Sequence, residues 1–221
     1  SITVMWETTR PALHTLWVGP SEDALEEVPF AQGDGTTLAE VTVEGLEPGT
    51  PYVYRVESSD RPDRQLPSEL RTFQTAVEAD TPFAFAIISD TQGNPEVSGR
   101  IAAHAFGQRP HFALIPGDLV ETGPELDHWT GHFFPSMEPL ISRVPFYPVL
   151  GNHEQDTRYY YRYAAVPAPE YYYEFEYGNA AFFVIDSNRN VDPGSEQYRW
   201  LDAALGRSKA VWKFVSFHHP S

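Results

Sequence analysis

From residue 83 onward the sequence contains a series of short apolar segments, each followed directly by polar residues, and this pattern limits the folds that the chain can adopt. Apolar strands that alternate with helix-like segments are typical of an α/β layered fold, and such sheets bind ligands beyond the carboxyl ends of their strands. We therefore expect these polar residues to meet at one edge of a sheet. The segments and their polar groups are 83–89 with Ser89-Asp90-Thr91-Gln92, 111–116 with Gly117-Asp118, 146–150 with Gly151-Asn152-His153-Glu154, and 211–217 with His218-His219.

The rest of this part of the chain fits the same fold class. The run 83–89 is almost continuously apolar, which predicts a strand covered on both faces. A β-hairpin is predicted around the turn-forming pair Gly178-Asn179, between 171–177 and 180–185. Helical segments are predicted at 95–106, at 125–141 with an interruption, and at 195–205.

The first third of the chain predicts an all-β sandwich. Short runs of β-forming residues are separated by proline, glycine, aspartate and serine, and many short strands with frequent turns favour two packed sheets. Trp6 is expected to fill the space between these sheets. The predicted strands are 2–6, 13–18, 38–43, 52–56 and 70–73.

One segment in this third is more specific. Leu46-Glu47-Pro48-Gly49-Thr50-Pro51-Tyr52 resembles the fibronectin type III pattern in which a tyrosine hydrogen-bonds back across a corner. The tryptophan strand begins at residue 2, so the usual first edge strand is expected to be missing. Residues 77–82, polar with a proline, mark the predicted boundary between a domain at 1–78 and a second at 79–221.

Composition excludes several classes of function. The formal net charge of −16 argues against binding to nucleic acid backbones or anionic membranes, which require a positive surface. The absence of cysteine excludes a thiolate metal site and a cysteine nucleophile. No apolar run approaches the roughly 20 residues that a membrane span requires.

The polar groups after the strands have the chemistry of metal ligands. Aspartate oxygens, an asparagine oxygen and imidazole nitrogens form a mixed donor set that suits Mn, Fe, Zn or Co rather than Ca. The glycines beside Asp118 and Asn152 allow the backbone to turn sharply after each strand.

These motifs resemble the calcineurin-like metallophosphoesterase superfamily, and the domain order resembles that of the purple acid phosphatases. The resemblance rests on Gly117-Asp118, on Gly151-Asn152-His153-Glu154, and on Val215-Ser216-Phe217-His218-His219-Pro220. It implies a fibronectin type III-like β-sandwich followed by an α/β metallophosphoesterase domain with a β-sandwich core flanked by helices. It also implies hydrolysis of a small phosphoester, with secretion, periplasmic location or display at the cell surface.

The resemblance further implies a role for each motif residue. Two divalent or trivalent transition metals would be bridged by Asp118, with Asp90 and Gln92 on the first metal. Asn152 and His218 would hold the second metal, and a metal-bound hydroxide would attack phosphorus. His153 would stabilise the transition state or protonate the leaving oxygen, with Glu154 as a candidate to orient it.

The chain departs from the family pattern at three places. Glu121 stands where purple acid phosphatases have the tyrosine that gives their colour, so we expect a colourless enzyme. Gln92 stands where the superfamily usually has histidine, which predicts a weaker first metal site. The late Gly-His-x-His motif has no counterpart. We therefore expect this chain alone to be inactive and its parent polypeptide to supply the missing histidines.

Several readings stay open. The main alternative to an enzyme is a binding or scaffolding protein with a degenerate site, for which Gln92, Glu121 and the missing late histidine motif are the arguments. Among other histidines, packing or surface roles are expected, with His128 and neighbouring Trp129 as candidates for a substrate rim; the others are His14, His104, His111 and His132. The tyrosine runs 159–161 and 171–173 favour packing over stacking on a substrate. Arg189 fits a phosphate contact or a structural ion pair.

Overall fold

The structure is a computed structural model that describes residues 1–32, 35–61 and 64–220. The chain divides into two compact units, Ser1–Ala76 and Val77–Ser221. The first unit is strand-rich, and the second alternates strands with helices. This order confirms the predicted fold class.

The first unit is organised around one long strand, β1 (Ile2–Gly19). Its first half pairs antiparallel with β3, and its second half pairs antiparallel with β2 and β4. The register shifts between Glu7 and Ala12, so the two predicted strands 2–6 and 13–18 are parts of one irregular strand. The other described strands are β2 (Glu26–Val28), β3 (Thr36–Val43), β4 (Pro51–Arg61), β5 (Arg64–Pro67) and β6 (Arg71–Gln74), and a 3-10 turn, η1 (Glu22–Ala24), precedes β2.

Two aromatic residues for which the sequence predicts structural roles, Trp6 and Tyr52, have such roles in this unit. The Tyr52 hydroxyl accepts a hydrogen bond from the main-chain N–H of Glu47 at 3.1 Å, which is the corner contact expected of it. Trp6 packs against the core of the unit, and its indole N–H lies 3.1 Å from Nδ1 of the buried His14. These contacts assign packing roles to Trp6, Tyr52 and His14.

The second unit contains two three-stranded sheets. In the first, β7 (Phe85–Ile87), β8 (Phe112–Pro116) and β9 (Phe146–Val149) run parallel in that order. In the second, the hairpin of β10 (Tyr173–Tyr177) and β11 (Ala180–Val184) is antiparallel, and β12 (Trp212–Ser216) pairs parallel with β11. The predicted hairpin is thus present, with Gly178 in the left-handed region at φ 54°.

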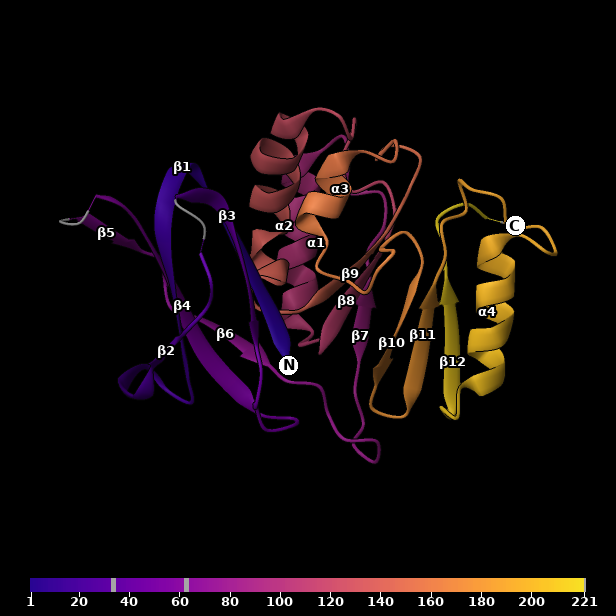
Figure 1. Cartoon of the computed structure of the whole chain (residues 1–221), viewed down its shortest axis with the longest axis horizontal. Helices are drawn as coiled ribbons and strands as arrows, with labels where there is room; N and C mark the ends of the chain where they lie inside the picture. Colours follow the sequence, from indigo (N-terminus) through magenta and orange to yellow (C-terminus); the bar gives the residue numbers. More distant parts are fainter. Residues whose placement is uncertain (33–34, 62–63, 221) are drawn as a thin grey trace. The chain divides into compact units, whose positions relative to one another are not determined.

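Helices cover the outer sides of both sheets (Figure 1). The first sheet carries α1 (Pro95–Gly107) and α2 (Phe134–Ile141), and the second carries α4 (Glu196–Arg207). The interrupted helix predicted at 125–141 consists of a π-helix, η2 (His128–Phe133), that leads directly into α2. A short helix, α3 (Arg158–Tyr163), follows β9.

Aromatic side chains fill the space between the two sheets. The ring of Phe112 stacks on Phe85 with centroids 5.0 Å apart and meets Phe182 edge-on at 5.2 Å. On the outer side of the second sheet, Phe183 packs in a cluster with Trp200 of α4. Both faces of β11 are therefore buried, which explains its five consecutive apolar residues.

The outer strands of these sheets expose apolar side chains, contrary to the expectation that 83–89 is covered on both faces. Each of β7 and β12 pairs with a neighbour on one side only in the part of the chain that the structure describes. Ile87 is 62% exposed and Trp212 is 61% exposed. Six exposed apolar residues lie on or next to β7 and β12, and we call them the exposed apolar rim: Ile87, Val211, Trp212, Phe214, Val215 and Phe217.

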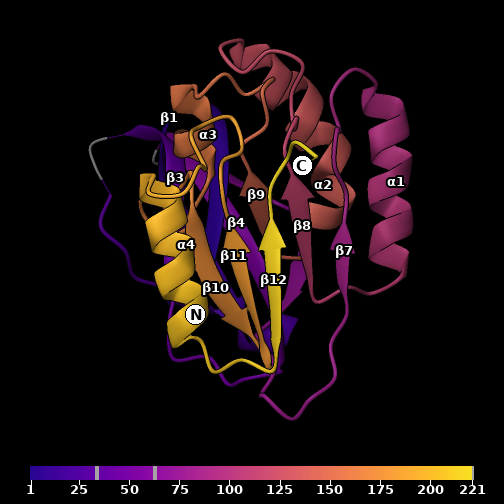
Figure 2. The same ribbon diagram turned by 90° about the vertical axis from the view of Figure 1, so that its right-hand side faces the viewer.

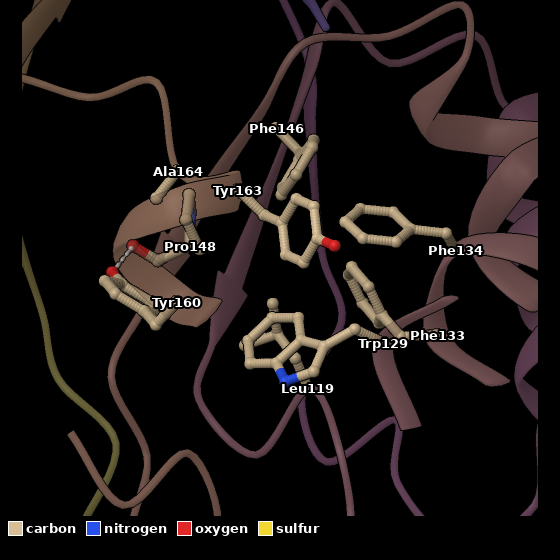
Figure 3. Close-up of a pocket in the computed structure, with 9 residues that line it drawn as sticks. All are labelled: Leu119, Trp129, Phe133, Phe134, Phe146, Pro148, Tyr160, Tyr163 and Ala164. Atoms are coloured by element: carbon tan, nitrogen blue, oxygen red, sulfur yellow. Dashed lines mark hydrogen bonds between the residues drawn. The ribbon is translucent and has the colours of Figure 1, made fainter. Parts of the chain in front are cut away.

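A small apolar cavity lies beside η2 and α3, and Trp129 is one of the residues that line it (Figure 3). Its indole is 1% exposed, and the indole N–H donates to the carbonyl of Gly123 at 2.8 Å. Tyr160 lines the same cavity and donates its hydroxyl to the carbonyl of Pro148. The hypothesis that Trp129 lines a substrate rim is therefore wrong, because tertiary packing buries the side chain. Among the described residues, no helix is long and apolar enough to cross a membrane.

Candidate metal centre

The predicted donor residues lie where parallel strands end. Asp90 follows β7, Asp118 follows β8, Asn152 follows β9 and His218 follows β12. Parallel pairing within each sheet directs the carboxyl ends of neighbouring strands to the same side, and Figure 2 shows β8 and β12 ending near the same place. The fold thus brings together residues that are far apart in the sequence.

The backbone after β8 adopts a conformation that favours glycine. Gly117 has φ 88°, and a Cβ atom there would lie 2.5 Å from Nδ1 of His218. Asp118 and Asp90 also have positive φ values, 52° and 55°. Non-glycine residues in this region store strain, which proteins retain mainly at functional sites.

Three ionisable side chains converge at this edge. Asp90, Asp118 and His218 each place one possible ligand atom within 4.8 Å of the others. Nε2 of His218 lies 3.3 Å from Oδ1 of Asp118 and 3.2 Å from Oδ1 of Asn152. Asp118 is buried, whereas Asp90 is exposed and accepts a hydrogen bond from the Ser89 hydroxyl.

The hydrogen bonding of His218 shows why this cluster suits a cation. Its Nδ1 lies 2.8 Å from the carbonyl oxygen of Pro116, which can only accept, so Nδ1 carries the proton. In the neutral ring Nε2 then offers a lone pair, and it faces the oxygens of Asp118 and Asn152. A cation placed among these lone pairs would satisfy all of them. The donor set therefore fits a transition metal.

Gln92 reaches the same cluster through its amide. Its Nε2 donates to Oδ2 of Asp118 at 3.4 Å, while its Oε1 is buried and has no hydrogen-bond partner. A half-turn of the amide would exchange these two atoms and direct the oxygen towards Asp118. The orphaned oxygen is a second observation that fits a cation here.

The imidazole of His153 also lies near the Asp118 carboxylate. Its Nδ1 lies 2.7 Å from the carbonyl oxygen of Glu121, and its Nε2 lies 3.9 Å from Oδ2 of Asp118. The hydrogen bond to Glu121 raises the pKa of His153, burial opposes this shift, and the Asp118 carboxylate adds to it. The imidazole is thus oriented by a main-chain carbonyl and presents Nε2 to the cluster.

Glu154 does not have the predicted role of orienting His153. Its buried carboxylate instead accepts main-chain N–H groups, at 2.9 Å from Asp118, 2.7 Å from Leu119, 3.3 Å from Val120 and 2.7 Å from Gly151. Burial raises the pKa of Glu154, and these hydrogen bonds act in the opposite direction. Glu154 therefore joins the segment after β8 to the segment after β9.

The remaining candidates have structural partners. Arg189 forms ion pairs with Asp186 at 3.0 Å and Asp156 at 2.8 Å, which favours its structural reading. Tyr160 and Tyr173 both donate to the carbonyl of Pro148, which favours packing for the tyrosine runs. His128 stacks on His132 with ring centroids 5.1 Å apart.

His219 is a residue for which the sequence predicted no separate role. Its Nε2 lies 3.1 Å from Oδ1 of Asn152 and its Nδ1 lies 3.0 Å from the Ser187 hydroxyl. Its position directly after His218 was the available signal. Ser187, which follows β11, gave no signal of its own because a single serine in a loop is common.

Comparison with known proteins agrees with this architecture. Purple acid phosphatase 15 of Arabidopsis thaliana is 25% identical over 222 aligned residues, covering 81% of this chain and 41% of that protein. Purple acid phosphatase 23 of the same plant is 26% identical and covers 81% of this chain and 48% of that protein. The chain thus spans less than half the length of these relatives.

A solved structure and a family model extend the match. The purple acid phosphatase from yellow lupin (Lupinus luteus) seeds has the same fold, with a TM-score of 0.81 at 16% identity over 96% of this chain and 48% of that one. The family model of the calcineurin-like phosphoesterases matches residues 83–221, which contain all of the predicted donor residues. This chain belongs to the calcineurin-like phosphoesterase family.

Proposed function

We propose that the protein hydrolyses phosphoester bonds in a small substrate, using two transition metals bound at the carboxyl ends of β7, β8, β9 and β12. The observation that carries this proposal is the set of lone pairs from Asp118, Asn152 and His218 that face one another. Membership of the calcineurin-like phosphoesterase family supports the same reaction class. Manganese, iron, zinc and cobalt all suit this mixture of oxygen and nitrogen donors.

The donors divide into two groups around Asp118. Asp90 and Gln92 would hold one metal with Asp118, and Asn152 with His218 would hold the other. When bound, such metals neutralise charge on the phosphoryl oxygens and acidify the attacking water. Asp118 is the natural bridge because its Oδ1 faces His218 and its Oδ2 faces Gln92.

We propose that His153 acts on the leaving oxygen of the substrate. Its Nδ1 is fixed by Glu121, so its Nε2 can point to a substrate held next to Asp118. When it carries a proton, Nε2 can donate to a phosphoryl oxygen or to the leaving oxygen. His153 would therefore bind and protonate the substrate rather than hold a metal.

Other parts of the proposal concern the protein that carries this chain. We propose that 1–78 is a fibronectin type III-like domain and 79–221 the metallophosphoesterase domain, close to the division of the structure after Ala76. The plant relatives are named purple acid phosphatases, which supports phosphatase chemistry; the proposed substrate is a small phosphoester. Secretion and a colourless site, the latter because of Glu121, belong to the same proposal.

The proposed donors leave both metals with few protein ligands. Structural and catalytic zinc sites have three or four protein ligands each, and Asp90, Gln92, Asp118, Asn152 and His218 must serve two metals. We therefore propose that additional histidines complete both shells in the parent polypeptide, and that the 221-residue chain alone has little activity.

The test replaces Asp118 by asparagine. Asp118→Asn in the parent polypeptide is expected to lower the metal content from about two ions per chain, measured by inductively coupled plasma mass spectrometry after dialysis, and to abolish hydrolysis of p-nitrophenyl phosphate. Asp202→Asn is the matched control, because Asp202 is exposed on α4. A wild-type protein that retains no metal, or an Asp118→Asn variant that keeps its activity, would overturn the proposal.

The second candidate is a protein that has kept the fold and lost catalysis. Two relatives are named probable inactive purple acid phosphatases, numbers 24 and 27 of Arabidopsis thaliana, and each match covers 46% of this chain. Gln92 and Glu121 are the residues that favour this candidate. It predicts wild-type protein without hydrolytic activity and partner binding that Asp118→Asn leaves unchanged.

A further inference from the structure

The side-chain amide of Asn152 has two chemically different ends, and only one of them can bind a metal. Its oxygen faces His218 at 3.2 Å. A half-turn of the amide would place its NH₂ group there instead, and that group offers hydrogen atoms rather than a lone pair. A metal site that depends on Asn152 therefore needs some group that selects the orientation of the amide.

His218 does not make that selection. Its Nδ1 donates to the carbonyl of Pro116, so the neutral ring presents a bare Nε2 to Asn152. A bare nitrogen would prefer the NH₂ end of the amide, because that end can donate to it. In the absence of metal, His218 thus favours the wrong orientation.

His219 supplies the opposite preference through Ser187. The Ser187 hydroxyl oxygen accepts the main-chain N–H of His219 at 2.9 Å and lies 3.0 Å from Nδ1 of the same residue. The hydroxyl has one hydrogen to donate, and donating it to Nδ1 leaves a lone pair of the oxygen to accept the main-chain N–H. The proton of the neutral imidazole then resides on Nε2, which lies 3.1 Å from the Asn152 oxygen.

We infer that Ser187 and His219 are positioning residues that hold the Asn152 amide with its oxygen towards the metal donors. The chain of hydrogen bonds runs from the Ser187 hydroxyl to Nδ1 of His219, and from Nε2–H of His219 to Oδ1 of Asn152. This inference rests on the proposed function, because it gives Asn152 the role of a metal ligand. Unlike the proposed metal donors, His219 would form a hydrogen bond with Asn152 and would not bind a metal.

The segment that carries Ser187 is well anchored, so it can serve as a fixed reference. Asp186 is buried and exchanges two main-chain hydrogen bonds with the Gln197 side chain, at 2.7 and 2.9 Å. Asn188 donates to the carbonyl of Leu150, just before the Asn152 segment, at 3.3 Å. The carboxylate of Asp186 also holds Arg189. The loop after β11 is thereby tied both to α4 and to the loop after β9.

The first experiment measures zinc affinity by calorimetry in the parent polypeptide. His219→Leu is expected to weaken binding of one of two zinc ions by about 10- to 100-fold, as is common when a partner of a metal ligand is removed. Ser187→Ala should weaken the binding of the same zinc ion by a smaller factor. His104→Leu is the matched control, because His104 is exposed on α1.

Repeating the experiment in the Asn152→Asp variant distinguishes an effect on the orientation of the residue 152 side chain from a general effect on the structure of the site. In Asn152→Asp protein the two carboxylate oxygens are equivalent, so no orientation has to be selected. Adding His219→Leu to Asn152→Asp should therefore change zinc affinity by at most about threefold. An equal loss in both backgrounds would show that His219 acts in some other way and would overturn the inference.

A third measurement needs no metal. In ¹⁵N-labelled, metal-free protein, the imidazole nitrogen shifts of His219 are expected to show the proton on Nε2, and Ser187→Ala should reduce this preference. A proton on Nδ1 would overturn the inference even if His219→Leu failed to fold. Wild-type protein that binds no zinc would instead contradict the proposed function, whereas normal binding that His219→Leu leaves unchanged would overturn this inference alone.

Discussion

At the scale of single residues, Gly117 is a position with little room for any side chain. It combines φ 88° with a contact that a Cβ atom would make at 2.5 Å to His218 and another at 2.9 Å to Gly151. The clash with Gly151 involves main-chain atoms, which cannot move aside as the end of a flexible side chain can. The site thus depends on a residue that has no side chain.

Gly117→Ala is expected to lower the free energy of unfolding by about 1–3 kcal/mol or more and to abolish zinc binding, because the left-handed backbone strains any side chain. Urea denaturation and calorimetric zinc titration measure the two effects. Gly206→Ala is the control: Gly206 lies in α4 with open space around it, so alanine there should stabilise by about 0.5–1 kcal/mol. Unchanged zinc binding in Gly117→Ala would contradict the close packing described for the site.

Glu154 offers a second prediction at this scale. Glu154→Gln replaces one acceptor oxygen by an NH₂ group that faces main-chain N–H groups, and is expected to lower the free energy of unfolding by about 1–3 kcal/mol. Urea denaturation provides the measurement, with exposed Glu176→Gln as the control. Equal stabilities of the two variants would show that the four N–H contacts of Glu154 contribute little.

Site residues that belong to a sequence motif could be predicted from the sequence, whereas residues whose partners are main-chain atoms could not. Asp90, Asp118 and His218 were predicted from the polar groups after apolar strands, and the structure brings them together. The role of Glu154 was missed because main-chain N–H groups are the same at every position and leave no mark in the sequence. Trp129 was misplaced because its burial is decided by residues of other elements.

At the scale of elements, the corner before β4 is the most specific feature of the first unit. The Tyr52 hydroxyl lies across the turn from the main-chain N–H of Glu47, and its ring stacks on Phe73 at 5.6 Å. The ring and the hydroxyl therefore contribute separately, the first to the core and the second to the corner.

Tyr52→Phe removes only the hydroxyl, and is expected to lower the free energy of unfolding of the first unit by about 0.5–1.5 kcal/mol. Differential scanning calorimetry should show the change in the transition of that unit. Tyr198→Phe is the control, because Tyr198 is exposed on α4 and its hydroxyl makes no described hydrogen bond. A Tyr52→Phe variant as stable as the control would contradict a structural role for the corner contact.

The strands of this unit also show where sequence patterns fail. The stretch from Glu7 to Pro11 is polar and contains proline, which predicts a break, yet β1 continues through it with a shift of register. The short strands β2 and β5 were not predicted because they are brief and largely polar, and their pairing with β1 and β4 decides their conformation. Strands with strong apolar patterns, such as β8 and β11, were predicted close to their ends.

At the scale of the whole molecule, metal should stabilise one unit and leave the other unchanged. All proposed donors lie in Val77–Ser221, and a ligand present at about 100 times its dissociation constant adds about 2.7 kcal/mol. For a domain of this size that corresponds to roughly 5–10 °C in Tm. Calorimetry of the parent polypeptide with and without a chelator is the measurement. A chelator that lowers the same transition that Tyr52→Phe lowers would contradict the assignment of donors.

The exposed apolar rim predicts behaviour of the isolated 221-residue chain. Unpaired outer strands with apolar side chains favour association, so light scattering after size-exclusion chromatography should show a mass that rises with concentration. Trp212→Glu is expected to reduce this association. Val191→Glu is the control, since Val191 is 42% exposed in a loop outside the rim. Equal association of both variants would locate the adhesive surface elsewhere.

The order of the donors along the chain has a consequence for how the protein is made. Asp90 and His218 contact the same small volume although 128 positions separate them, counted as 218 minus 90. A ribosome that adds about 5–20 residues per second needs roughly 6–26 s to pass from one to the other. During that interval the early carboxylates are already synthesised while the imidazole that neighbours them is not. Loading of the proposed metal site would therefore be a late event in biosynthesis, and a pulse-labelled, stalled nascent chain that ends before β12 is expected to retain no metal.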